Sequence, residues 1–207
     1  MKLSQRITKL NGEGDDGWSV FYRARALKAA GAPIVELTIG EHDIRTHGDI
    51  LAAMNASAIG GHTGYAMVPG VKSLRETVAN RIQDRTGVPT GPENVMITPG
   101  GQSALFSSHY AVCNPGDAAL YLDPYYATYP GTLRAAGAIP RVVHTRAEDA
   151  FQPRGEDIAA QAQGAVSLLI NSPNNPTGTV YSRATLGGIA DVCKAHDLWL
   201  ISDEVYD

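Results

Sequence analysis

The sequence predicts an α/β protein built on a doubly wound, mostly parallel sheet. Short apolar runs recur along the chain and are separated by gaps of helix length. Most of these runs lack a period of two, which is typical of strands that are covered by helices on both faces. The expected strands occupy residues 95–98, 118–123, 140–145, 165–171 and 198–203.

Helical patterns fill several of the gaps between these strands. In residues 71–87 apolar side chains repeat on one face of a helix, and Gly87 offers a C-terminal stop. Before the last strand, Ser182 is a candidate N-cap for a second amphipathic helix. This alternation of strands and helices is what a parallel sheet with crossover helices requires.

The first 46 residues follow a different pattern. A helix is predicted near residues 19–30, Gly31 stops it, and residues 33–40 have the composition of a strand. We therefore expect residues 1–46 to form a segment that is distinct from residues 47–207.

Composition excludes several classes of function. The net charge is -4 and the basic residues are scattered, so no surface for nucleic acid is expected. No apolar run approaches the roughly 20 residues of a membrane span, and the N-terminus has no apolar stretch of signal-peptide length. Cys113 and Cys193 lie within helical apolar patterns and are expected to be buried free thiols. These features predict a soluble, cytoplasmic protein with no membrane or nucleic-acid partner and no metal site.

Polar side chains follow the last two predicted strands. Asn175 lies in the stretch NSPNNPTG, which begins where residues 165–171 end, and Asp203 and Tyr206 close the last strand. Because the carboxyl ends of parallel strands meet at one edge of a sheet, we expect these three side chains to converge. An amide, a carboxylate and a phenol suit a flat, charged heteroaromatic ligand.

Five short motifs occur in a fixed order from Tyr65 to Tyr206. In combination they resemble the class I and II aminotransferases, enzymes that use pyridoxal 5'-phosphate (PLP) and share the fold of aspartate aminotransferase. Each motif alone could arise by chance, whereas the ordered set could hardly do so. The motifs are YAMVPGVKSLR at 65–75, TPGGQSAL at 98–105, DPYYATYP at 123–130, NNPTG at 174–178 and SDEVY at 202–206.

The resemblance implies a PLP site around Asp203. The carboxylate of Asp203 is expected to keep the pyridine nitrogen protonated, while Asn175 and Tyr206 hydrogen-bond the phenolic oxygen of the ring. Tyr126 matches the aromatic residue that stacks on the ring, with Tyr125 and Tyr129 as competitors for that role.

The same resemblance assigns the remaining contacts. Gly101 and Gln102 are expected at the phosphate, because a glycine pair before a helix start exposes N–H groups that bind anions. Tyr65 matches a tyrosine that reaches the phosphate of the neighbouring subunit, which implies a homodimer. Gly40 matches a glycine that contacts the substrate.

One catalytic group is not found in this sequence. PLP enzymes bind the cofactor through a lysine that also moves the substrate proton, and none of the five lysines here matches the family position. In the family this lysine follows the SDEVY strand, as do two further strands of the sheet, so we expect it beyond Asp207. The resemblance therefore divides the chain into an N-terminal arm with a small-domain segment (1–46) and an incomplete large PLP-binding domain (47–207), which alone is expected to be inactive.

The function that this resemblance implies is transfer of an amino group between an amino acid and a 2-oxo acid. Carbon–sulfur lyases and decarboxylases of the same fold remain open as alternatives, as does a truncated, noncatalytic binding protein. Residues 12–17 formally spell the dinucleotide motif GxGxxG, but no strand precedes them and two acidic residues would face a pyrophosphate. Four potential metal ligands match no strong spacing and indicate a solvated loop, namely His42, Asp43, His47 and Asp49.

Overall fold

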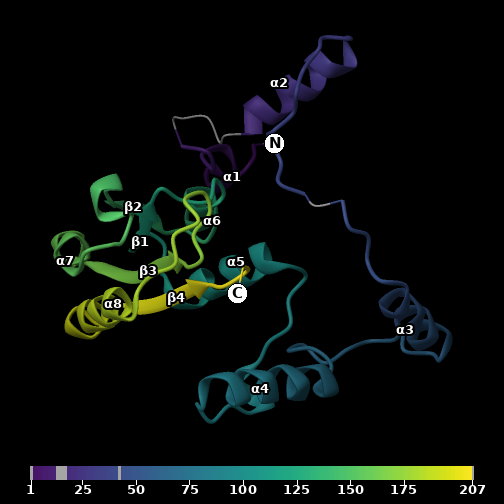
Figure 1. Ribbon diagram of the computed structural model, residues 1–207. Helices are drawn as coiled ribbons and strands as arrows, with labels where there is room; N and C mark the ends of the chain where they lie inside the picture. Colours follow the sequence, from purple (N-terminus) through teal and green to yellow (C-terminus); the bar gives the residue numbers. More distant parts are fainter. Residues whose placement is uncertain (1, 13–17, 42, 207) are drawn as a thin grey trace. The chain divides into compact units, whose positions relative to one another are not determined.

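A computed structural model describes residues 2–12, 18–41 and 43–206 of the chain (Figure 1). The chain divides into two compact units. The first combines the residues up to Ser19 with those from Pro99 onward, and the second holds Val20–Thr98. Parts of two sequence features lie outside the described residues. They are residues 13–17 of the GxGxxG stretch, and His42 among the potential metal ligands. The predicted domain division after residue 46 remains a prediction.

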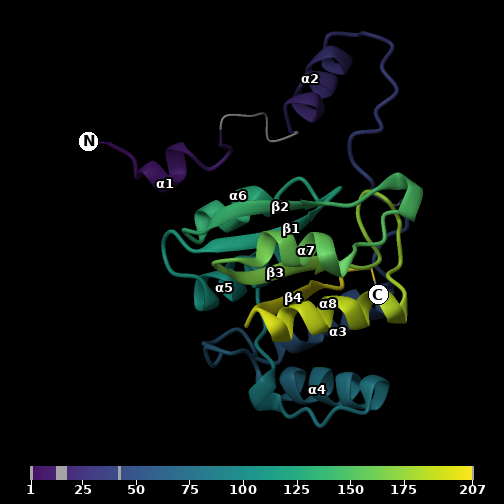
Figure 2. The ribbon, with the colours of Figure 1, turned by 90° about the vertical axis from the view of Figure 1, so that its left-hand side faces the viewer.

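The first unit contains the predicted parallel sheet. Its four strands lie in the order β2–β1–β3–β4, and every neighbouring pair is parallel (Figure 2). The structure confirms four of the five strands predicted between residues 95 and 203, and their ends agree with the predicted ends to within one residue. Their bounds are β1 (Ala118–Asp123), β2 (Ile139–His144), β3 (Ala165–Asn171) and β4 (Trp199–Asp203).

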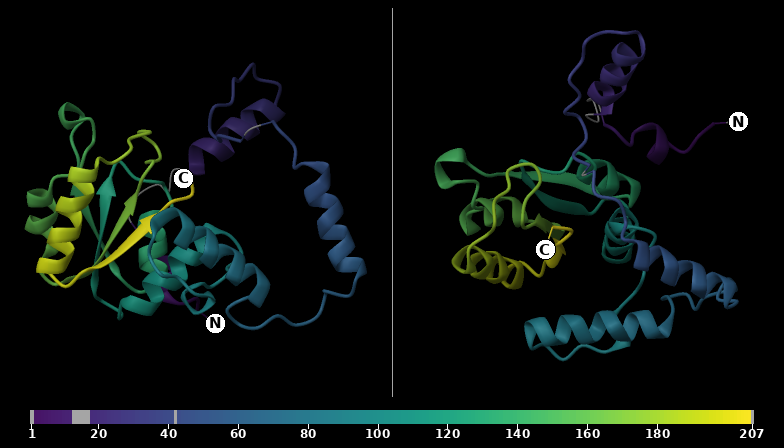
Figure 3. Two further views of the ribbon diagram at one scale, coloured as in Figure 1. Left: turned by 60° about the horizontal axis from the view of Figure 1, so that its bottom comes forward. Right: turned by 45° about the vertical axis from the view of Figure 1, so that its right-hand side comes forward.

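Helices cover both faces of this sheet, as the doubly wound prediction requires (Figure 3). Helices α7 (Gly155–Ala162) and α8 (Arg183–Ala195) pack on one face, where Leu120 and Leu168 point into the core. Helices α5 (Gly101–Val112) and α6 (Tyr129–Ala135) pack on the other face, against Tyr121 and Leu169. Because neighbouring strand residues point to opposite faces, each strand supplies both layers of the core. The unit also contains α1 (Gln5–Thr8) and the 3-10 turn η2 (Ala147–Asp149).

Local signals in the first unit act as predicted. The hydroxyl of Ser182 accepts a hydrogen bond from the Thr185 backbone N–H at 3.0 Å and caps α8. Cys113 and Cys193 are buried free thiols, and burial raises the pKa of both.

The second unit is mainly helical. It contains most of α2 (Trp18–Ala29), which confirms the predicted helix, together with α3 (Gly48–Ile59), α4 (Lys72–Thr86) and the 3-10 turn η1 (Pro92–Asn94). Gly87 ends α4 in the left-handed region, and its N–H bonds to the Gln83 carbonyl at 2.8 Å. None of the described helices is both long and apolar enough to span a membrane.

Two predicted strands are wrong. Residues 33–40 and 95–98 are irregular, and within the described part of the chain no strand pairs with either segment. The Ile97 N–H donates instead to the Pro69 carbonyl at 2.9 Å. An extended, apolar segment becomes a strand only when a neighbour satisfies its backbone groups, and composition does not supply that neighbour.

His109 is an unusual member of the core. It lies in α5 and is fully buried, and neither ring nitrogen has a hydrogen-bonding partner. Burial lowers its pKa to about 4, from an ordinary value of 6.5. The folded chain therefore holds a neutral imidazole at neutral pH, at the cost of two unsatisfied polar atoms.

We expect His109→Phe to flatten the acid dependence of stability. Between about pH 6.5 and about pH 4 the unfolded chain binds a proton at His109 that the folded chain does not, so stability falls as the pH is lowered. The substitution should remove a loss of roughly 1 kcal/mol between about pH 6.5 and about pH 5.5, measured by urea unfolding. The exposed His196→Asn is the control, and equal pH dependence in both variants would contradict the assignment.

Candidate active site

The carboxylate of Asp203 is held from both sides at the end of β4. Tyr129 donates its phenolic hydrogen to Oδ2 of Asp203 at 2.8 Å, and the Val205 N–H donates to Oδ1 at 3.2 Å. The strand register places Asn171 of β3 beside Asp203. The Asn171 side-chain amide donates to the Asp203 carbonyl at 2.9 Å. The last residue of β4 is therefore fixed through both its backbone and its side chain.

Tyr129 serves as a permanent donor in this arrangement. It is buried, and burial together with the hydrogen bond to Asp203 raises the pKa of its phenol far above the ordinary range. The phenol therefore stays protonated at physiological pH and points its hydrogen at the carboxylate. Burial also raises the pKa of Tyr181, to about 12.

The other two members of the predicted trio are linked to Asp203 through Asn171. Asn171 accepts a hydrogen bond from the Asn175 backbone N–H at 2.7 Å, so one asparagine contacts both Asn175 and Asp203. The Asn175 side chain in turn donates to the Tyr206 hydroxyl at 2.8 Å. The structure thus brings Asn175, Asp203 and Tyr206 together at one edge of the sheet, as the parallel arrangement predicted.

The three tyrosines of DPYYATYP have different surroundings. Tyr129 is committed to Asp203, and Tyr125 packs edge-on against Tyr121 with the ring centroids 4.9 Å apart. Tyr126 is 37% exposed, and its ring meets Tyr129 at 5.9 Å with an interplanar angle of 73°. Of the three, Tyr126 is the most exposed, and it lies next to Tyr129, the hydrogen-bonding partner of Asp203.

The start of α5 forms a potential anion site. Gly100 precedes the helix with a φ of 86°, a left-handed conformation that favours glycine. A Cβ atom placed on Gly101 would meet no heavy atom within 4 Å, so the space beside its Cα atom is open. The first backbone N–H groups of a helix have no partner within the helix, and they and the helix dipole attract anions.

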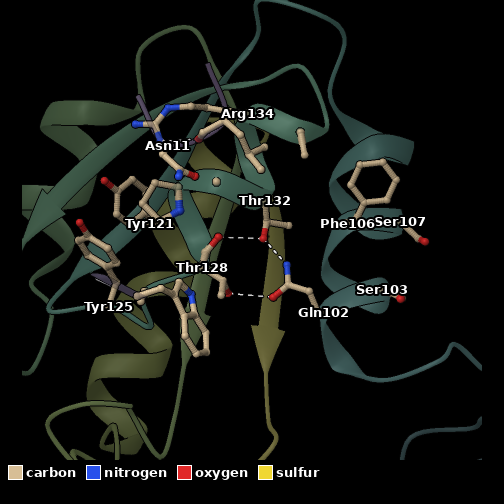
Figure 4. Close-up of a pocket in the computed structure, with 16 residues that line it drawn as sticks. Asn11, Gln102, Ser103, Phe106, Ser107, Tyr121, Tyr125, Thr128, Thr132 and Arg134 are labelled. Atoms are coloured by element: carbon tan, nitrogen blue, oxygen red, sulfur yellow. Dashed lines mark hydrogen bonds between the residues drawn. The ribbon is translucent and has the colours of Figure 1, made fainter. Parts of the chain in front are cut away.

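The side chain of Gln102 does not point into that open space. It reaches across to α6, where its Oε1 accepts from the Thr128 hydroxyl at 2.8 Å and its Nε2 donates closely to the Thr132 hydroxyl (Figure 4). Only the backbone of Gln102 can therefore make the predicted contact with a phosphate.

A hollow of about 980 Å³ lies between α5 and α6 in the first unit (Figure 4). Gln102 and Thr128 form part of its wall, and the aromatic side chains that line it are Trp18, Phe106, Tyr121 and Tyr125. Asp203, Asn175 and Tyr206 do not line it. The hollow therefore adjoins the predicted site and does not contain it.

Two predicted site residues belong to the second unit. Tyr65 is fully exposed, and Gly40 lies in an irregular segment where an added Cβ would meet nothing within 4 Å. Their predicted roles, at the neighbouring subunit and at the substrate, stay predictions. Of the potential metal ligands, His47 caps α3 by accepting from the Asp49 N–H at 3.3 Å. No group of three potential metal ligands occurs among the residues that the structure describes.

Sequence reasoning missed several residues that build this site. Tyr129 was only a competitor for ring stacking, and nothing local marks it as the partner of a carboxylate 74 residues away. Asn171 opens the NSPNNPTG stretch, so its place at a strand end was the one available signal. Thr128 and Thr132 gave no signal at all.

Known proteins share both the sequence pattern and the fold of this chain. A family model described as aminotransferase class I and II matches residues 32–207. The chain belongs to this family. Among its relatives, the arginine–pyruvate transaminase of Pseudomonas aeruginosa is 37% identical over 207 residues, covering 100% of this chain and 53% of that protein. The aspartate/prephenate aminotransferase of Thermus thermophilus is 37% identical over 186 residues, covering 89% of this chain and 48% of that protein.

Solved structures of the family show the same fold. The aspartate aminotransferase of Thermus thermophilus with maleate has a TM-score of 0.91 at 34% identity, covering 100% of this chain and 54% of that one. An alanine aminotransferase of Pyrococcus furiosus has a TM-score of 0.91 at 28% identity, covering 100% and 53%. The chain thus spans about half the length of the family members it matches.

We expect Tyr129→Phe to lower the free energy of unfolding by about 1–2 kcal/mol, because it removes a hydrogen bond to a charged acceptor and leaves the packing intact. Urea unfolding measures this, with the exposed Tyr110→Phe as the matched control. In an Asp203→Ala background the same substitution should cost almost nothing. An equal cost in both backgrounds would show that the effect does not come from this hydrogen bond.

Proposed function

We propose that the chain is the N-terminal portion of a PLP-dependent aminotransferase that transfers an amino group between an amino acid and a 2-oxo acid. The observation that carries this proposal is the carboxylate of Asp203, oriented by Tyr129 and flanked by the Asn175–Tyr206 pair. A fixed carboxylate beside an amide and a phenol is the donor and acceptor set that a protonated pyridine ring with an adjacent oxygen requires.

The residues of the chain fit this cofactor. When bound, PLP supplies an electron sink for the pair left on the substrate Cα. Asp203 would hold the proton on the ring nitrogen, and Asn175 and Tyr206 would hydrogen-bond the ring oxygen. The open start of α5 at Gly101 would take the phosphate, and Tyr126 would cover one face of the ring.

The names of the relatives favour transamination over carbon–sulfur cleavage or decarboxylation. Those compared above are transaminases for arginine and pyruvate, for aspartate and prephenate, and for alanine. Their named substrates differ in charge and size, so they support an amino acid and a 2-oxo acid as the substrate class and no particular pair. As parts of the same proposal, the whole protein is a cytoplasmic homodimer in which Tyr65 reaches the neighbouring site and Gly40 contacts the substrate. Its catalytic lysine lies beyond Asp207.

The proposal is tested with pyridoxamine 5'-phosphate, which has no aldehyde and so forms no covalent bond with the five lysines. Asp203→Asn should weaken binding by about 10- to 100-fold, because a charge-assisted hydrogen bond to the ring nitrogen contributes roughly 1.5–3 kcal/mol. Calorimetric titration measures the affinity, and Glu204→Gln, which removes the neighbouring carboxylate, should bind normally. No binding to the unaltered chain, or equal losses in both variants, would refute the site.

Amino-group transfer itself is tested in the whole protein. Mixed with an amino acid, the PLP-loaded protein should accumulate pyridoxamine 5'-phosphate and release the matching 2-oxo acid. Release of a thiol or of carbon dioxide instead would point to the alternative reactions.

A further inference from the structure

The side chain of Gln102 connects the two helices that flank the proposed cofactor site. Gln102 lies in the first turn of α5, at the proposed phosphate site, yet both polar atoms of its amide are used on α6. Thr128 donates to the amide oxygen, and Thr132 accepts from the amide nitrogen (Figure 4). An amide satisfied at both ends has one preferred orientation, so it fixes one helix relative to the other.

The turn that receives Gln102 has a hydrogen bond of its own. The Thr132 hydroxyl donates to the Thr128 carbonyl at 2.9 Å, which closes a ring of hydrogen bonds through Gln102, Thr128 and Thr132. Thr132 is buried, and Gln102 and Thr128 form part of the wall of the hollow described above. The ring therefore behaves as one unit at the start of α6.

The same turn also reaches the opposite end of the site. Tyr129 lies between the two threonines and donates to Asp203 at 2.8 Å. The start of α6 is therefore bonded to α5 at the proposed phosphate end and to β4 at the proposed ring-nitrogen end. Its geometry sets the separation of the two groups that must hold one ligand at once.

We propose that Gln102 is a positioning residue, whose side chain ties the phosphate-binding turn to α6 and does not touch the phosphate. This inference rests on the proposed PLP site. A ligand that spans both ends gains its affinity from two contacts made at a fixed distance, and a shift of one end weakens it. A ligand held only at the ring end does not depend on that distance.

Two ligands and three substitutions test the proposal on the chain by calorimetric titration. The ligands are pyridoxamine 5'-phosphate, which reaches both ends, and pyridoxamine, which lacks the phosphate. Gln102→Met and Thr132→Val should each weaken binding of the phosphorylated ligand by about tenfold, as expected for loss of hydrogen bonds contributing roughly 1.5 kcal/mol. Binding of pyridoxamine should change less than about twofold in these two variants. The separate substitution Thr132→Ser keeps the hydroxyl, so that variant should bind both pyridoxamine 5'-phosphate and pyridoxamine with full affinity.

Thr132→Val separates positioning from direct contact. If the Gln102 side chain were itself a phosphate ligand, Thr132→Val would free the amide for the phosphate, and affinity would be unchanged or higher. That result overturns the proposal, as does an equal loss for both ligands in Gln102→Met. The exposed Gln161→Met on α7 is the matched control, and melting temperatures show that the variants remain folded.

Failure of the underlying function looks different. If the unaltered chain binds neither ligand, or if Asp203→Asn binds both as well as the unaltered chain does, the PLP site itself is refuted and this inference with it. If Asp203→Asn weakens both ligands while Gln102→Met and Thr132→Val weaken neither, the cofactor site stands and the positioning role is refuted.

Discussion

The site depends on the parallel register between β3 and β4. Because Asn171 pairs with Asp203 across the two strands, the loop that follows one strand and the carboxylate that ends the other start from the same edge. Asn171 then uses both ends of its amide, donating to the Asp203 carbonyl and accepting from the Asn175 N–H. Asn175 and Tyr206 are 31 residues apart in the sequence, so the strand register is what brings them within hydrogen-bonding distance.

A second constraint comes from the short helix α6. Seven residues long, it contributes Thr132 to α5 and Tyr129 to Asp203, so it links two elements that do not follow one another in the chain. Its stability comes from packing, because Tyr129 and Leu133 are almost fully buried against the sheet. Side chains that are locked by packing hold a binding geometry more closely than side chains on an exposed loop do.

Among the described residues, the core beneath the site includes a fully buried histidine whose ring makes no hydrogen bond. His109 faces the interior from α5 with both ring nitrogens unsatisfied, although the same helix begins at the proposed phosphate site. A buried polar group of this kind lowers stability and does not help packing. Neither ring nitrogen is hydrogen-bonded to Asp203, to Gln102 or to any other described residue, so we assign it no role in the chemistry.

The sequence by itself determined the strands that are covered on both faces, the helix caps at Ser182 and Gly87, and the polar trio at the strand ends. These are local properties, since periodicity, capping and motif order are written in neighbouring residues. Tertiary structure alone decided that residues 33–40 and 95–98 are not strands, that Tyr129 and not Tyr125 or Tyr126 meets Asp203, and that the Gln102 amide turns toward α6. Each of these depends on which distant groups lie within hydrogen-bonding distance, and that is fixed only when the chain packs.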